Sequence, residues 1–253
     1  PSIIASGTPS AGQIKVESVG PFDGVLSLDY GYYSRALNPS TITGGNWWVG
    51  NSQQAGAFYF NDSIGAASNG KYLLGGGGNQ SGVTFGGALV SGNRAALFEN
   101  LFSGGSANSV RLEIGAQTAD FAWNAPAFVN GNIGYITLLT RNTGLTGDVR
   151  VNTGSALAIG NNFALGSGRL IFNGGLLRAD VASATFGNTN NFVTNQITLD
   201  NNVVLQGDWG TAAVGNELVL NGNVAMSDVA GSGATRTWAL AGTAPMAVGL
   251  TPG

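Results

Sequence analysis

The chain contains no cysteine and no histidine among its 253 residues. Without cysteine it can form neither disulfides nor thiolate metal sites, and without histidine it lacks the commonest general base and metal ligand. Charged residues are also scarce, at 9% of the sequence, compared with about a quarter in an average soluble domain. Most enzyme mechanisms lose a participant through these absences, so we expect no catalysis and no cofactor.

Positive charge is especially sparse, because the only lysines are Lys15 and Lys71 and the net charge is -3. A chain without a basic stripe is a poor partner for nucleic acid or an anionic membrane surface. No apolar run approaches the roughly 18 residues of a membrane span, so we expect no membrane insertion of this segment. Because Pro1–Gly20 lacks the basic and apolar regions of a signal peptide, we interpret the chain as a processed product or part of a longer protein in a soluble extracellular setting.

Glycine and apolar residues are abundant by contrast: 42 residues are glycine and 43% of the chain is hydrophobic. Glycine and asparagine tolerate the positive φ angles of tight turns, while β-branched and apolar residues favour strands. The composition therefore predicts an all-β fold of many short strands around a substantial core.

Four-residue apolar segments recur through the C-terminal part of the chain, in steps of 21, 27, 21 and 20 residues. These segments begin at Val149, Leu170, Ile197, Leu218 and Trp238. A second series follows each of them by 6 to 8 residues and begins at Leu157, Leu176, Val203, Val224 and Met246. A fixed period of this length is typical of a solenoid.

The N-terminal part repeats less regularly. One series begins at Leu26, Trp47, Tyr72, Leu97 and Phe121, and another at Phe58, Val83, Val110 and Tyr135. The period drifts near Asn142, so we divide the chain into residues 1–141 and residues 142–253.

Alternate residues of a strand face the same side, so pairs such as Val149 and Val151 would point inward and stack on Leu170 and Phe172 one turn away. The same reasoning turns Ile197, Leu199, Leu218 and Leu220 inward. We therefore predict a parallel β-helix of roughly ten coils of about 20–27 residues, in preference to a β-sandwich, which gives no reason for the repeated offsets.

The segment that begins at Leu176 departs from this pattern, because a strict offset of six would place Arg178 on the inner face. A one-residue slip at Gly174 and Gly175 would turn Leu177 and Ala179 inward instead and free Arg178.

The stretch Asn142–Asp180 resembles the autotransporter-associated β-strand repeat of bacterial autotransporter passengers, most closely over LGSGRLIFNGGLLRA at Leu165–Ala179. Residues 181–253 match the repeat only in a degenerate form. Residues 1–141 resemble it only in general character and do not match its motif. The resemblance implies a right-handed β-helix outside the cell, delivered in such proteins by an outer-membrane barrel. It brings no catalytic residues with it.

Aromatic residues cluster near the N-terminus at Tyr30, Tyr32, Tyr33, Trp47 and Trp48. Exposed rings in such a cluster could stack on sugar rings, with nearby amides as hydrogen-bond partners. The alternative is a bulky apolar cover over the first coils, because aromatic residues usually belong to a core.

Polar residues end four of the C-terminal segments, at Asn152, Asn173, Asp200 and Asn221. Such residues could bind calcium, but the sequence lacks the nonapeptide and DxDxDG motifs that gather several oxygens around one ion. We expect a hydrogen-bonded column of turn residues and no metal site.

Paired carboxylates for glycoside hydrolysis could be sought among Glu99, Glu113 and Asp120. Glu113 lies between two apolar residues, as an outward-facing strand residue would. No acidic cluster recurs at the coil spacing, and the run Gly75–Gly78 lacks the lysine of a phosphate loop, so neither pattern favours catalysis.

These observations predict a non-catalytic extracellular segment of a bacterial surface protein with a structural, display or adhesive role. One alternative is a self-assembling filament or sheath subunit that stacks end to end, because solenoid ends expose strand edges. Another is a carbohydrate-binding module that uses the aromatic cluster. The expected partners are other copies of the chain or a cell-surface glycan or protein.

Overall fold

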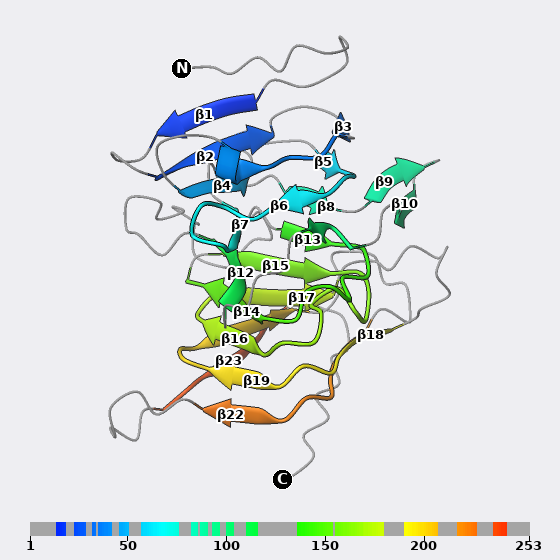
Figure 1. The fold of residues 1–253 in the computed structure, drawn as a ribbon. Helices are drawn as coiled ribbons and strands as arrows, with labels where there is room; N and C mark the ends of the chain where they lie inside the picture. The colour runs from blue at the N-terminus through cyan, green and yellow to red at the C-terminus, as the bar shows by residue number, and fades with distance from the viewer. Residues whose placement is uncertain are drawn as a thin grey trace.

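The chain folds into β-strands. The computed structural model describes residues 14–18, 23–28, 32–33, 35–41, 46–50, 57–75, 82–85, 87–90, 93–96, 100–103, 110–115, 136–153, 155–179, 190–206, 217–226 and 235–241. Within these residues the only helical element is the single 3-10 turn η1 (Pro39–Thr41), and most strand pairs are parallel (Figure 1). The prediction of an all-β fold is confirmed.

In the described part of the chain, the first long sheet has nine strands in the order β1-β2-β4-β7-β12-β14-β16-β19-β22. Their bounds are β1 Ile14–Ser18, β2 Asp23–Leu28, β4 Asn46–Gly50, β7 Tyr72–Leu74, β12 Val110–Ile114, β14 Asp148–Asn152, β16 Leu170–Asn173, β19 Ile197–Leu199 and β22 Val224–Met226. The pair β1–β2 is antiparallel and the other neighbours are parallel.

The second long sheet has eight described strands, all parallel, in the order β3-β5-β8-β13-β15-β17-β20-β23. Their bounds are β3 Tyr32–Tyr33, β5 Ala57–Phe60, β8 Gly82–Phe85, β13 Ile136–Leu138, β15 Ala156–Ile159, β17 Leu176–Ala179, β20 Val203–Gln206 and β23 Trp238–Ala241.

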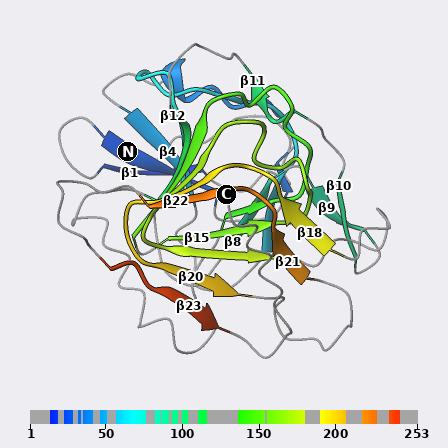
Figure 2. The same cartoon turned by 90° about the horizontal axis from the view of Figure 1, so that it is seen from below.

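Three short sheets complete the described strands. Two of them are parallel pairs, β6 (Ile64–Gly65) with β11 (Phe102–Ser103) and β18 (Asn190–Val193) with β21 (Glu217–Leu220). The third is the antiparallel pair β9 (Gly87–Val90) and β10 (Asn93–Ala96). Seen along the stack, the first long sheet, the second long sheet and the short sheets lie on different sides of the molecule (Figure 2).

The inner face of the first sheet consists of apolar columns that run across the strands. One column joins residues that lie opposite each other in register: Leu26, Val49, Leu74, Ile114, Val151, Phe172 and Leu199. A second column joins Tyr72, Leu112, Val149, Leu170, Ile197 and Val224. Each fully buried aliphatic side chain contributes about 1.5–3 kcal/mol, so the columns are the main source of stability.

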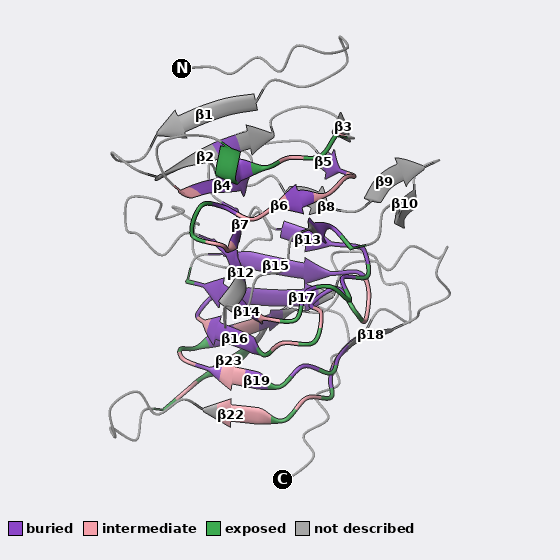
Figure 3. Ribbon diagram, viewed as in Figure 1, coloured by how far each residue is buried: buried purple, intermediate pink, exposed green. Residues whose placement is uncertain are grey.

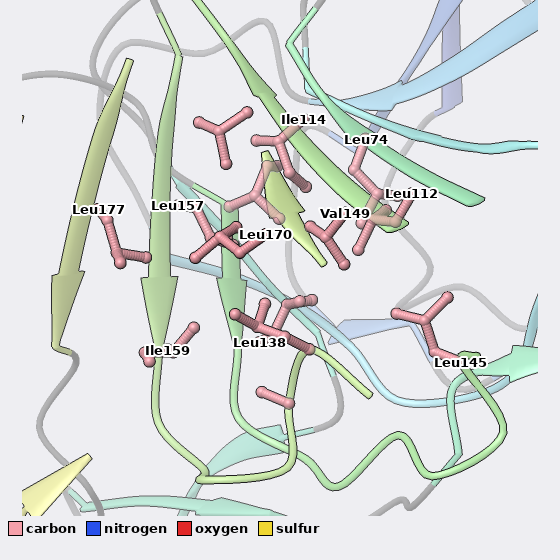
Figure 4. Packing of buried hydrophobic residues seen from close by; sticks show 14 of the residues in the cluster. Leu74, Leu112, Ile114, Leu138, Leu145, Val149, Leu157, Ile159, Leu170 and Leu177 are labelled. Atoms are coloured by element: carbon pink, nitrogen blue, oxygen red, sulfur yellow. The ribbon is translucent and has the colours of Figure 1, made fainter. Parts of the chain in front are cut away.

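The second sheet contributes a matching column of Ile136, Leu157, Leu177 and Leu205. Side chains such as Leu157 and Leu177 point from this sheet toward Val149 and Leu112 of the first (Figure 4). Buried residues of both sheets belong to one continuous core, which runs from Leu26 to Leu220. Strands before and after residue 142 share both sheets and this core.

The predicted stacking of Val149, Leu170 and Ile197 is confirmed, since these three residues are direct neighbours in register. The prediction for Leu218 is wrong. Leu218 lies in β21, which pairs with β18 in a short sheet, and Val224 takes the place beside Ile197. The step from Ile197 to Val224 is 27 residues, equal to the preceding step from Leu170. Because Leu218 and Val224 both begin short alternating apolar runs, pattern alone did not distinguish them.

The second predicted series shows a similar mixture. Leu157, Leu176 and Val203 lie in strands of one sheet, as predicted. Val224 was predicted in the same series but lies in the first sheet, and Trp238 joins the second sheet beside Val203 and not the first. Met246 lies outside the described residues. The misplacement of Trp238 has the same cause as that of Leu218, a strand of the short sheets inserted into the period.

In the N-terminal part, Leu26, Trp47 and Tyr72 lie in the first sheet as predicted, and Phe58 is the register neighbour of Val83 in the second. Val110 was assigned to the wrong series: it begins β12, which joins β7 to β14 in the first sheet. The predicted positions Leu97, Phe121 and Tyr135 lie outside the described residues.

The slip at Gly174 and Gly175 is confirmed. Both glycines have positive φ angles, 92° and 86°, and Leu177 rather than Leu176 lies opposite Leu157 in the core. Arg178 is not freed, however, and is only 3% exposed. Its row on the outer face of the second sheet includes Thr137 and Ala158, which are fully buried, so β13, β15 and β17 are covered on both faces (Figure 3).

Candidate functional site

The two tryptophans of the predicted aromatic platform are buried, at 9% exposure for Trp47 and 7% for Trp48. Trp47 belongs to the main core, and Trp48 packs in a second cluster with Ala67 and Leu73 on the other face of β4. An aromatic residue that binds sugar must offer an open face. Burial of both tryptophans argues against the sugar-stacking interpretation and supports its alternative, an apolar cover of the first coils, because both faces of β4 are covered.

The tyrosines of the same cluster add no open ring in the described part of the chain. Tyr33 is half-buried and packs against the core. Tyr30 and the side chain of Tyr32 lie outside the described residues.

The structure brings together the first two members of the predicted turn column. Asn152 and Asn173 are register neighbours, and Nδ2 of Asn173 lies 3.4 Å from Oδ1 of Asn152. Asp200 follows β19 in the same sheet, and its backbone N–H donates to the carbonyl of Phe172. Asn221 follows β21 and lies beside Val193, away from the other three.

Two other asparagines, which sequence reasoning missed, tie turns together on the side of the short sheets. Nδ2 of Asn142 donates to the carbonyl of Ala164 at 2.9 Å, and its Oδ1 accepts the backbone N–H of Leu101 at 3.0 Å. Nδ2 of Asn195 donates to the carbonyls of Gly166 and Gly168. Both side chains are buried. We call these residues and the turns they join, 100–101, 140–145, 161–168 and 195–196, the asparagine corner.

Charged side chains lie on the outer face of the first sheet. Lys71 Nζ is 2.6 Å from Glu113 Oε1, and Arg169 Nη2 is 2.6 Å from Asp148 Oδ2. The hydrogen bond from Arg169 to Asp148 raises the pKa of the guanidinium above its ordinary value, so Arg169 stays charged. Glu113 points outward, as predicted, and is engaged by Lys71.

Among the residues that the structure describes, no group of three or more histidines, cysteines or acidic residues is placed to hold a metal ion. Glu99 and Asp120, the other acids considered from the sequence, lie outside those residues.

Four of the exposed side chains of the asparagine corner come from three neighbouring turns: Asn100, Arg141, Thr143 and Phe163. We call this set the corner patch. Phe163 is 52% exposed and is the one large hydrophobic side chain exposed in the described part of the chain. The Arg141 guanidinium carbon lies 5.0 Å from the centre of the Phe163 ring, in cation–π contact.

Backbone and side-chain hydrogen bonds hold the patch in place. The backbone N–H of Asn100 donates to the carbonyl of Arg141 at 2.8 Å, and that of Asn142 donates to the carbonyl of Phe163 at 3.0 Å. Asn100 Oδ1 accepts from Thr143 Oγ1 at 3.0 Å. Asn100 has a φ of 55°, a left-handed conformation that asparagine tolerates better than most residues. The sequence did not predict this set, since its members lie on three turns that are separated along the chain.

Comparisons of the chain with protein-family models, with curated proteins and with solved structures found no match. No helix in the described residues is both long and apolar enough to cross a membrane.

Proposed function

We propose that this chain is a non-catalytic extracellular segment of a bacterial surface protein, with a structural, display or adhesive role, and that it winds as a right-handed parallel β-helix of about ten coils. The observation that carries the proposal is the pair of long parallel sheets whose apolar columns face a shared core. Such a stack gains rigidity from every added coil and needs no disulfide, which the cysteine-free chain could not form.

The arrangement suits the display of binding residues, because the stacked strands form a rigid support while the sequences of the turns can vary. Functional residues of repeat folds usually lie in the lateral turns, while the stacked strands fix their positions. The exposed corner patch is an example of residues held in this way. The resemblance of residues 142–180 to autotransporter repeats supports the extracellular assignment.

Immunolabelling of intact cells tests the location. Antibodies raised against the chain should label intact cells of the producing organism and lose the signal after brief surface proteolysis. Labelling that requires permeabilised cells would refute an extracellular role.

Engineered disulfides test the winding, because the chain has no cysteine of its own. Thr198 and Ala225 are register neighbours in the first sheet, within the reach of a disulfide. The double variant Thr198→Cys, Ala225→Cys should cross-link on mild oxidation. The matched pair Thr198→Cys, Val219→Cys follows the register predicted from sequence and should stay reduced, since Val219 lies in β21 of a short sheet. The reverse result would contradict the stacking.

End-to-end assembly is a second candidate function. In the described part of the chain, β22 and β23 have a neighbour on one side only, and their residues Val224, Ala225 and Trp238 are only half-buried (Figure 3). Unpaired strand edges are templates for pairing with another chain.

Light scattering over a wide concentration range tests this candidate. Growth of the particle mass with concentration is expected, and the Ala225→Lys variant on the edge strand should suppress it. Thr198→Lys, one strand further in and on the same face, is the matched control and should assemble normally. A mass that stays monomeric throughout excludes assembly by this segment.

A further inference from the structure

Arg141 forms no ion pair with an acidic residue among the described residues, in contrast to Lys71 and Arg169, and its guanidinium lies over an aromatic ring instead. Lys71 and Arg169 each form an ion pair at 2.6 Å, with Glu113 and Asp148. Arg141 is exposed, and its guanidinium instead stacks on Phe163. The stacking fixes the guanidinium while its edge remains able to donate hydrogen bonds to an anion.

Phe163 is presented by a rigid turn. Its backbone N–H donates to Oδ1 of Asn161 at 2.9 Å, and its carbonyl accepts from the backbone N–H groups of Asn142 and Gly166. The next two residues, Ala164 and Leu165, are anchored in the core. An exposed ring on a preorganised turn loses little conformational entropy on binding, which favours recognition.

We propose that the corner patch binds a sugar residue that carries a carboxylate, within an acidic polysaccharide. The apolar face of the sugar packs against the part of the Phe163 ring that remains exposed beside the guanidinium, and the carboxylate pairs with Arg141. The amide of Asn100 and the hydroxyl of Thr143 lie on the adjoining turns and supply hydrogen bonds to sugar hydroxyls. This inference rests on the proposed extracellular role, because it names the ligand class of an adhesive segment.

The chemistry favours an acidic sugar over the alternatives. A neutral sugar would use the ring and leave the guanidinium without an anionic partner. An extended polyanion such as nucleic acid needs a row of cations, whereas the chain has ten lysines and arginines in total and a net charge of -3. One ring and one cation match one uronic-acid-like unit, with an expected dissociation constant on the order of 1 mM for a single unit.

Isothermal titration of the whole chain with a galacturonic acid trisaccharide, and with the matching neutral galactose trisaccharide, tests the assignment. We expect the acidic sugar to bind at least ten-fold more tightly, and the difference to shrink as sodium chloride is raised. Equal affinity for the two sugars, or binding of neither at millimolar concentration, would overturn the proposal. So would a triglutamate peptide that binds as tightly as the acidic sugar, since that result indicates recognition of a carboxylate alone.

Variants separate the two contacts. Phe163→Ala should abolish binding of the acidic sugar, whereas Arg141→Gln should remove the preference for it and leave weak binding of both sugars. Arg169→Gln, which removes an arginine already paired with Asp148, is the matched control and should bind normally. Circular dichroism spectra confirm that each variant is folded. Unchanged binding by Phe163→Ala would exclude the patch as the site.

The inference and the proposed function can fail separately. Surface labelling without sugar binding leaves the extracellular role in place and removes the ligand. Sugar binding by a protein that is labelled only in permeabilised cells removes the extracellular role and leaves the binding site.

Discussion

The long sheets and the asparagine corner are held together by different forces. In the long sheets, each strand repeats the same contact, an apolar side chain packed on its register neighbours, as Val151 packs on Phe172. In the corner, single side chains such as Asn142 and Asn195 reach backbone groups of other turns and are not repeated at every level. Repetition supplies stability along the stack, while the unique contacts shape one side of the molecule and position its exposed residues.

The largest effect is expected in the apolar columns. Phe172 is fully buried between Val151 and Leu199, so Phe172→Ala removes its contacts and leaves a cavity. We expect a loss of about 3–5 kcal/mol in the free energy of unfolding. Urea denaturation measures it, and Thr198→Ala on the outer face of the adjoining strand is the control. A loss below about 1 kcal/mol for Phe172→Ala would mean that the columns are not close-packed.

A smaller but clear effect is expected in the asparagine corner. Asn142→Ala leaves the N–H of Leu101 and the carbonyl of Ala164 without the partners that the side chain supplies. Unsatisfied buried polar groups cost about 1–3 kcal/mol each, and partial rearrangement should hold the total to about 2–3 kcal/mol in urea denaturation.

The control for the corner is Asn201→Ala, because Asn201 is exposed and its Oδ1 bonds only its neighbour Asn202 among described residues. It should change stability by less than about 0.5 kcal/mol. Equal losses for Asn142→Ala and Asn201→Ala would show that the corner depends on its backbone alone.

The next largest loss of stability is expected in the turn between β16 of the first sheet and β17 of the second. Gly175 has a φ of 86°, and a Cβ there would lie 2.7 Å from the carbonyl oxygen of Asn152. Gly175→Ala should therefore lose about 1–3 kcal/mol of stability by differential scanning calorimetry. Gly144, in the asparagine corner, has open space around the same position, so Gly144→Ala should be nearly neutral. Comparable losses at both glycines would refute the strain argument.

The same contrast explains how far the sequence could be interpreted. Alternation and period identified Val149, Leu170 and Ile197 as one column because repeated packing leaves a repeated pattern. They failed at Leu218, where a short-sheet strand with the same alternation precedes Val224. The alternation of apolar and polar residues predicts which face of a strand points inward, but it does not predict which sheet the strand joins.

Sequence could not predict the exposed and polar features of the molecule. The burial of Arg178 follows from cover on the outer face of the second sheet, which alternation within the strand does not report. Phe163 reads as one more apolar residue near Ala164 and Leu165, although only these two enter the core. The corner patch is formed by three turns that lie close together in space. The sequence has no repeated motif at these positions, so their proximity could not be predicted from it.

The smallest effect is expected for the charged pairs on the outer face of the first sheet. Arg169 is half exposed, at 49% of its side-chain surface, so solvent screens its attraction to Asp148. Arg169→Gln should cost less than about 1 kcal/mol in urea denaturation, and molar salt should reduce the difference further. A loss as large as that of Asn142→Ala, and insensitive to salt, would place the pair with the unique contacts of the corner. The stability of the long sheets would then depend on individual polar contacts as well as on repeated apolar packing.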